Sequence, residues 1–124
     1  MGGVAGHAGL FGTAADVAAI ALAILEPRRL GLNAGSLVPM LRPVAEGAGI
    51  RTVGFIRAAD AESVRGVLPD DAVGHLGFTG TSLWIDVKRP RVYVLLTNRV
   101  HPEVPKEPFT TTRRAFHALA STLS

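Results

Sequence analysis

The sequence predicts an α+β domain in which an antiparallel sheet meander is flanked by helices. Three short strand-like segments, 73–79, 81–87 and 91–98, follow one another with links too short for a crossover, and strands joined in this way pair antiparallel. Helical periodicity precedes them at 14–26 and follows them from Thr110 onward. A length of 124 residues with 48% hydrophobic content is enough for one domain to bury a core.

The first predicted helix spans residues 14–26. Thr13 is a good N-cap and Asp16 follows three residues later, close to the capping-box arrangement, while Pro27 ends the helix. Because apolar residues recur on two faces, we expect this helix to be buried on more than one side. These residues are Val17, Ala18, Ile20, Ala21, Leu22, Ile24 and Leu25.

The middle of the chain carries weaker signals. Prolines and glycines between residues 27 and 49 indicate loops around a short helical turn at 36–41. Residues 52–57 predict a short strand. Residues 58–71 contain four acids and predict a polar, irregular excursion that is a candidate rim for a site.

The last predicted strand and the last helix complete the fold. Strand 91–98 is apolar on both faces, so we expect helices on both sides of it and a central place in the sheet. Thr110 to Thr112 are the predicted cap of the final helix. The face predicted to dock on the sheet carries Phe116, Leu119, Ala120 and Leu123.

Residues 74–81, Gly-His-Leu-Gly-Phe-Thr-Gly-Thr, are the most informative segment. Its three glycines leave no side chain between a ligand and the backbone, so N–H groups here can reach a bound oxyanion or carbonyl. His75 at its start can donate to a substrate carboxylate or a transition-state oxygen, or tune proton transfer; a lone histidine with a structural role is the alternative. The pattern indicates one wall of an acyl-transfer site, which needs a nucleophile to work.

This pattern, followed by a strand, a turn and residues 92–99 (Val-Tyr-Val-Leu-Leu-Thr-Asn-Arg), resembles the third conserved element of the serine β-lactamase and penicillin-binding protein superfamily, which reads Lys-Thr-Gly or His-Thr-Gly. Residues 2–17 resemble that family's glycine-rich loop entering a helix. The resemblance implies the C-terminal part of a β-lactamase/transpeptidase-like fold. It also implies a serine hydrolase that forms an acyl-enzyme with a small-molecule or peptide substrate bearing an amide, ester or β-lactam bond.

The resemblance implies site roles for five residues. His75 and Gly77 are the catalytic candidates together with Phe78, whose backbone N–H is the predicted oxyanion donor and whose ring we expect in a pocket wall or the core. Thr79 and Asn98 are the candidates for substrate contact. A threonine is also favoured in strands and an asparagine in turns, so structural roles are the alternative for these two.

Several family features are missing. No serine is followed three places on by lysine, so the Ser-x-x-Lys nucleophile motif is absent, and so is Tyr-x-Asn or Ser-x-Asn. Leu76 stands where the family has Thr or Ser, and leucine offers no hydrogen bond to a substrate. We therefore expect the chain to be inactive alone. We read residues 1–124 as one incomplete domain, from a truncated gene, a mis-called start or a split protein, that needs an N-terminal half or a partner chain.

Two other functions compete with a hydrolase. A non-catalytic module of the same fold would bind a ligand or a partner at the sheet edge left exposed. A net charge of +3 with Lys and Arg outnumbering Asp and Glu by 13 to 10 suggests a nucleic-acid binder. The arginines are scattered and aromatic content is 6%, so we predict a solvated mixed surface and no nucleic-acid partner.

We predict no metal and no cofactor. The spacing of His7, His75 and His101 does not fit a metal site, and no phosphate-binding glycine motif opens a helix. The apolar stretch from Ala14 to Leu25 is short and contains Asp16, so we expect neither a signal peptide nor a membrane span. With no cysteine, the chain as written fits a cytoplasmic protein but does not specify a compartment.

Overall fold

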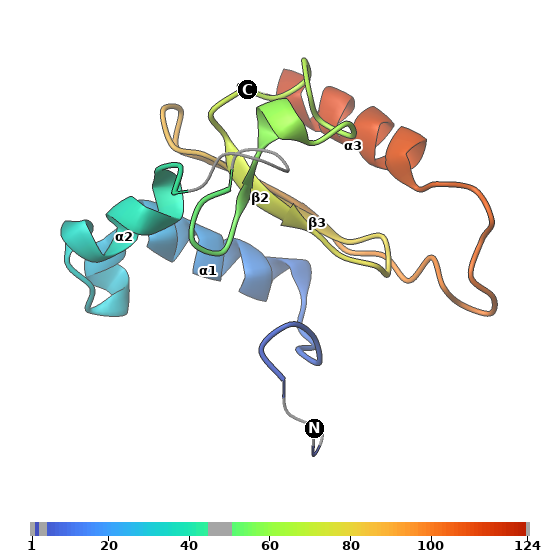
Figure 1. Cartoon of the computed structure of the whole chain (residues 1–124), viewed down its shortest axis with the longest axis horizontal. Helices are drawn as coiled ribbons and strands as arrows, with labels where there is room; N and C mark the ends of the chain where they lie inside the picture. The colour runs from blue at the N-terminus through green and yellow to red at the C-terminus, as the bar shows by residue number, and fades with distance from the viewer. Residues whose placement is uncertain (1, 3–4, 45–50, 124) are drawn as a thin grey trace.

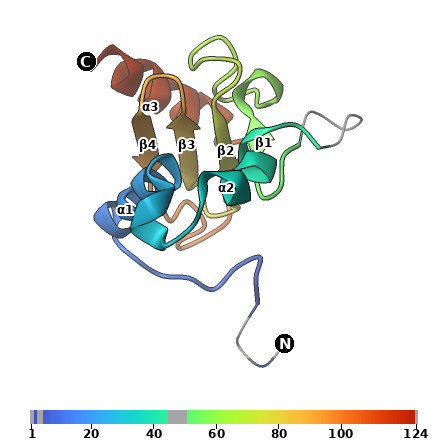
Figure 2. The same ribbon diagram turned by 90° about the vertical axis from the view of Figure 1, so that its left-hand side faces the viewer.

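The computed structural model describes residues 2, 5–44 and 51–123. Its sheet has the order β1-β2-β3-β4 with every neighbouring pair antiparallel. Figures 1 and 2 show α3 on one face of this sheet and α1 and α2 on the other. The predicted α+β meander is therefore confirmed. The elements are α1 (Ala14–Leu25), α2 (Ala34–Leu41), β1 (Ile56–Arg57), β2 (Val73–Leu76), β3 (Ser82–Asp86), β4 (Arg91–Leu95) and α3 (Thr110–Thr122).

Two apolar clusters lie on opposite faces of the sheet. Trp84, paired with Gly74 and Tyr93, is the largest fully buried side chain of the cluster on the α3 face. Ile85 belongs to the other cluster, which also contains residues of α1 and α2. Packing requires glycine at position 74, because a Cβ there would collide with the Leu83 carbonyl and the Trp84 ring. The sheet thus needs glycine beside its tryptophan.

Helix α1 begins as predicted but is buried differently. The Thr13 hydroxyl accepts from the Asp16 N–H and the Asp16 carboxylate accepts from the Thr13 N–H, which completes a capping box. These bonds lower the pKa of Asp16. Burial on more than one side is wrong, because Ile20 and Leu22 are exposed. In the described structure α1 covers a single face of the sheet, so its other side meets no second layer.

Two segments of the middle region differ from their predictions. The strand predicted at 52–57 shrinks to Ile56–Arg57, because the Thr52 N–H donates to the Phe55 carbonyl at 3.0 Å across a turn with Gly54 at positive φ. The helical turn predicted at 36–41 is confirmed within the longer α2. The polar excursion at 58–71 is wrong, since this segment supplies four buried residues to the Trp84 cluster. They are Ala58, Ala61, Val64 and Leu68.

Strand β4 lies at one end of the sheet rather than at its centre. Both faces are covered as predicted, by α1 on one side and α3 on the other. The central position was inferred from those two buried faces and is wrong, because helices can cover an edge strand equally well. Within the described residues β4 pairs only with β3, which leaves its other backbone edge open.

Helix α3 docks on the sheet with a polar side that the sequence analysis did not predict. Its N-cap is Phe109, with no side-chain capping bond, and Thr110 is already helical. Of the predicted apolar docking face, Leu119 and Leu123 are wrong, because they are 68% and 72% exposed. Ala120 packs against the Trp84 cluster, and Phe116 is partly buried. The residues of α3 that are buried are Arg113 and His117. Their partners are carbonyl groups and a serine at one end of the sheet.

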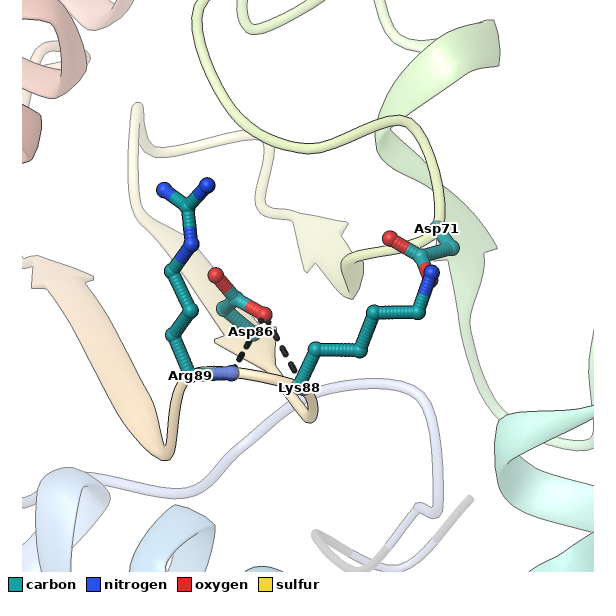
Figure 3. Close-up of polar contacts among 4 residues, drawn as sticks. All are labelled: Asp71, Asp86, Lys88 and Arg89. Carbon is teal, nitrogen blue, oxygen red and sulfur yellow. Dashed lines mark hydrogen bonds and ion pairs between the residues drawn. The ribbon is translucent and has the colours of Figure 1, made fainter.

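The opposite end of the sheet is fixed by the β3–β4 turn (Figure 3). The buried Asp86 carboxylate accepts from the backbone N–H groups of Lys88 and Arg89 at 3.0 and 3.1 Å. The Lys88 ammonium binds Asp71 at 2.7 Å, and this contact lowers the pKa of Asp71. The turn predicted between the last two strands is confirmed. Among the described residues no helix is long and apolar enough to cross a membrane.

Candidate active-site wall

The tip of the β2–β3 hairpin, residues 77–81, contains most of the predicted motif. The Gly77 N–H donates to the Thr81 carbonyl at 2.8 Å, and the Gly80 N–H donates to the Gly77 carbonyl at 3.1 Å. The predicted strands 73–79 and 81–87 therefore stop at Leu76 and begin at Ser82. A Cβ on Gly77 would collide with the Thr81 hydroxyl, and Gly80 has φ +96°. Glycine at both positions allows this tight turn.

Residues 97–99, directly after β4, are bonded to the tip. The Thr97 hydroxyl and the Arg99 N–H both donate to the Thr79 carbonyl, at 2.8 and 3.0 Å. Arg99 Nε donates to the Phe78 carbonyl at 3.0 Å, and its guanidinium lies over the Phe78 ring, 5.5 Å from the centroid. Asn98 is exposed between these two anchoring residues. The structure thus brings the segments of Thr79 and Asn98 together.

Helix α3 also holds the tip, through Arg113. Arg113 Nε donates to the Gly80 carbonyl at 3.1 Å, and its Nη2 donates to the Gly77 and Thr81 carbonyls at 2.6 and 3.3 Å. Burial lowers the pKa of Arg113, and the charge of Arg99 lowers it further. Sequence analysis missed this residue. The available signal was Arg113 and His117, two polar residues four apart, which share one helix face.

His117 forms a buried pair with Ser82. His117 Nε2 lies 2.8 Å from the Ser82 hydroxyl, and the two residues are 0% and 3% exposed. Burial, followed by the nearby charge of Arg113, lowers the pKa of His117 to about 4. The imidazole is therefore neutral at pH 7. Because neither group reaches the surface, this Ser–His pair serves to join α3 to β3.

His75 and Leu76 lie on opposite faces at the end of β2. His75 is exposed, and its Nδ1 lies 2.9 Å from the Leu76 carbonyl oxygen. Since a carbonyl only accepts, Nδ1 carries the hydrogen in this contact. The Leu76 side chain instead packs against the Trp84 cluster. This core contact explains why an apolar residue fits at position 76.

Phe78 has an exposed side chain and an amide without a hydrogen-bond partner among the described residues. The ring is 71% exposed, so a place in the core is wrong. Its N–H makes no hydrogen bond to any other residue that the structure describes. The carbonyls on either side of that N–H, those of Gly77 and Phe78, are held by Arg113 and Arg99. The result is a free amide donor in a region where arginine side chains concentrate positive charge.

The comparison with protein families decides the relationship of this chain to known proteins. The family model described as Beta-lactamase matches residues 1–117. This chain belongs to the β-lactamase family. Comparisons with curated proteins and with solved structures gave no match.

The β-lactamase match places the hairpin tip, residues 97–99 and most of α3 within the family region. It supports a fold related to serine hydrolases, and the α+β architecture agrees with part of a β-lactamase-like domain. The site roles of His75, Gly77, Phe78, Thr79 and Asn98 remain predictions. Over the described residues, no group of three His, Cys, Asp or Glu side chains is arranged to hold a metal ion.

Proposed function

We propose that this chain forms one wall of the acyl-transfer site of a serine hydrolase. The observation that carries the proposal is the Phe78 N–H, which makes no hydrogen bond within the described structure while the neighbouring carbonyls are held by arginines. A donor fixed in this way suits the oxygen of a substrate carbonyl that gains negative charge during nucleophilic attack. Removal of one such donor typically costs about 10²- to 10³-fold in rate.

His75 is the second element of the proposed wall. With Nδ1 directed to the Leu76 carbonyl, Nε2 is the ring nitrogen left to contact a substrate. Its exposed position at the end of β2 suits a group that exchanges a proton with a substrate or binds its carboxylate after protonation. Thr79 in the tip and Asn98 next to it are both exposed and are the proposed substrate contacts.

The nucleophile in this proposal comes from a segment outside the printed sequence. None of the serines has the Ser-x-x-Lys spacing, and Ser82 is buried against His117. The complementary segment would supply a serine that attacks an amide, ester or β-lactam bond to form an acyl-enzyme. The open edge of β4 offers backbone groups with which a further strand can pair. On this proposal, the 124-residue chain alone forms no acyl-enzyme.

A non-catalytic module of the same fold is the second candidate. Leu76 favours it, because leucine stands where the family resemblance implies a residue with a hydroxyl for substrate contact. The Leu76 side chain packs against the Trp84 cluster instead. Such a module would use the same exposed tip to bind a ligand without turnover.

Covalent labelling separates the two candidates. The purified 124-residue chain and the same chain extended through its upstream coding sequence would be treated with a fluorescent penicillin or a fluorophosphonate. We expect labelling of the extended chain only, abolished when the serine of its Ser-x-x-Lys motif is replaced by alanine. Labelling of neither form, or an upstream sequence without that motif, would favour the non-catalytic module. Labelling of the short chain would contradict the proposal.

A further inference from the structure

Arg113 of α3 donates hydrogen bonds to three backbone carbonyls of the hairpin tip. A largely buried guanidinium needs hydrogen-bond acceptors to offset its desolvation, and three carbonyls of the 77–81 tip supply them. The Gly77 contact is the shortest of the three, at 2.6 Å. These bonds join the C-terminal helix to the segment that contains the predicted oxyanion donor.

The Gly77 carbonyl and the Phe78 N–H belong to the same peptide group. In a planar trans peptide the C=O and the N–H point in opposite directions. When Arg113 holds the Gly77 oxygen toward α3, the Phe78 N–H is therefore directed away from α3. A charged donor on the oxygen also polarises the peptide, which makes its N–H a stronger donor.

We propose that Arg113 is the positioning residue of the active-site wall and acts through the Gly77–Phe78 peptide. It touches no substrate; it fixes and polarises the N–H that does. This inference rests on the proposed function for the identity of the bound oxygen. The orientation of the peptide by Arg113 is a property of the folded chain and can be measured without catalysis.

Arg114 provides a matched control on the same helix. It donates to the Glu62 and Arg65 carbonyls at 3.2 and 2.9 Å, so it also binds backbone carbonyls, but those of the segment before β2 rather than those of the tip. Arg114 is exposed. Replacement of either arginine by methionine removes the guanidinium from the same helix and leaves an unbranched side chain in its place.

Amide hydrogen exchange on the 124-residue chain tests the orientation. We expect Arg113→Met to accelerate exchange of the Gly77 and Gly80 amides about tenfold or more, since hydrogen bonds to charged groups are each worth about 1.5–3 kcal/mol. Arg114→Met should leave these two amides within about twofold and accelerate the Arg65 amide instead. Arg113→Lys should give an intermediate effect, and it decides the result if the methionine variant does not fold. Unchanged Gly77 and Gly80 exchange, or equal effects of both arginine variants, would overturn the proposal.

A double-mutant cycle in the extended, labelling-competent chain tests the route through the peptide. Phe78→Pro removes the N–H, so Arg113→Lys should slow acylation in the wild-type background but cause almost no further loss beside Phe78→Pro. The effect should fall on the rate at saturating probe rather than on probe affinity. Additive losses would contradict action through this peptide. If the extended chain does not label, the proposed function fails, while the exchange result still decides whether Arg113 orients the tip.

Discussion

The N-terminal segment, residues 5–12, and the β2–β3 hairpin tip both contain several glycines, but the surroundings of these glycines differ. In the N-terminal segment, a Cβ on Gly6 or Gly9 would meet no atom within 4 Å, and Leu10 and Phe11 are 98% and 100% exposed. Figure 1 shows this segment leading away from the sheet. At the tip, a Cβ on Gly77 or Gly80 would collide with neighbouring side chains. Glycine in a sequence thus indicates loops, but only packing shows which loops are fixed.

The largest expected effect is on the glycine beside Trp84. Gly74→Ala should lower the free energy of unfolding by about 3 kcal/mol, because the added methyl meets both a backbone carbonyl and a buried indole ring. Gly6→Ala is the matched control and should change stability by less than about 0.5 kcal/mol. Urea unfolding monitored by Trp84 fluorescence measures both. Similar effects of the two substitutions would remove the distinction between glycines required by packing and glycines in open loops.

The buried His117 of α3 should make the free energy of unfolding depend on pH. His117 has a folded pKa of about 4 against an ordinary value of 6.5, so the unfolded chain takes up a proton first as the pH falls. Stability is full above pH 6.5 and decreases toward pH 4, by about 2 kcal/mol between pH 6.5 and 5. Arg113 of α3 and the ring of Tyr93 of β4 face the imidazole.

Unfolding of the wild type and of His117→Gln, compared at pH 7 and pH 5, measures this dependence. The variant should be less stable at pH 7 but should lose little more at pH 5. A pH dependence equal to that of the wild type would show that His117 is not its source.

The smallest effect is expected in the N-terminal segment. Phe11→Ser should change the free energy of unfolding by less than about 0.5 kcal/mol, because the ring is fully exposed in the described structure. Thermal or urea unfolding is sufficient to check it. A loss above 1 kcal/mol would mean that this ring is packed in solution.

The sequence predicted the elements whose signals are local. The capping box of Thr13 and Asp16, the antiparallel meander and the short turn before Arg91 all depend on residues close together in the chain. The resemblance of residues 74–81 to the β-lactamase superfamily was also recognised, and the family match confirms that family, while the site roles stay predictions.

The errors concern contacts between segments far apart in the chain. Apolar periodicity placed Leu119 on the docking face of α3. Instead Arg113 and His117 are buried there, and their hydrogen-bond partners lie more than 30 residues earlier in the chain. The acids in 58–71 masked a set of core residues that includes Val64. Burial on both faces suggested a central β4, although strand order depends on pairing rather than on coverage.

The most direct test of the account compares Phe78→Pro with Phe78→Ala in the extended chain by the rate of acylation with a fluorescent β-lactam or fluorophosphonate. Proline removes the N–H without breaking a hydrogen bond within the described structure, whereas alanine removes the ring and keeps the N–H. The account predicts a loss of about 10²- to 10³-fold for proline and a change of only a few-fold for alanine. Equal rates for the two variants would contradict the assignment of the Phe78 N–H as the oxyanion donor.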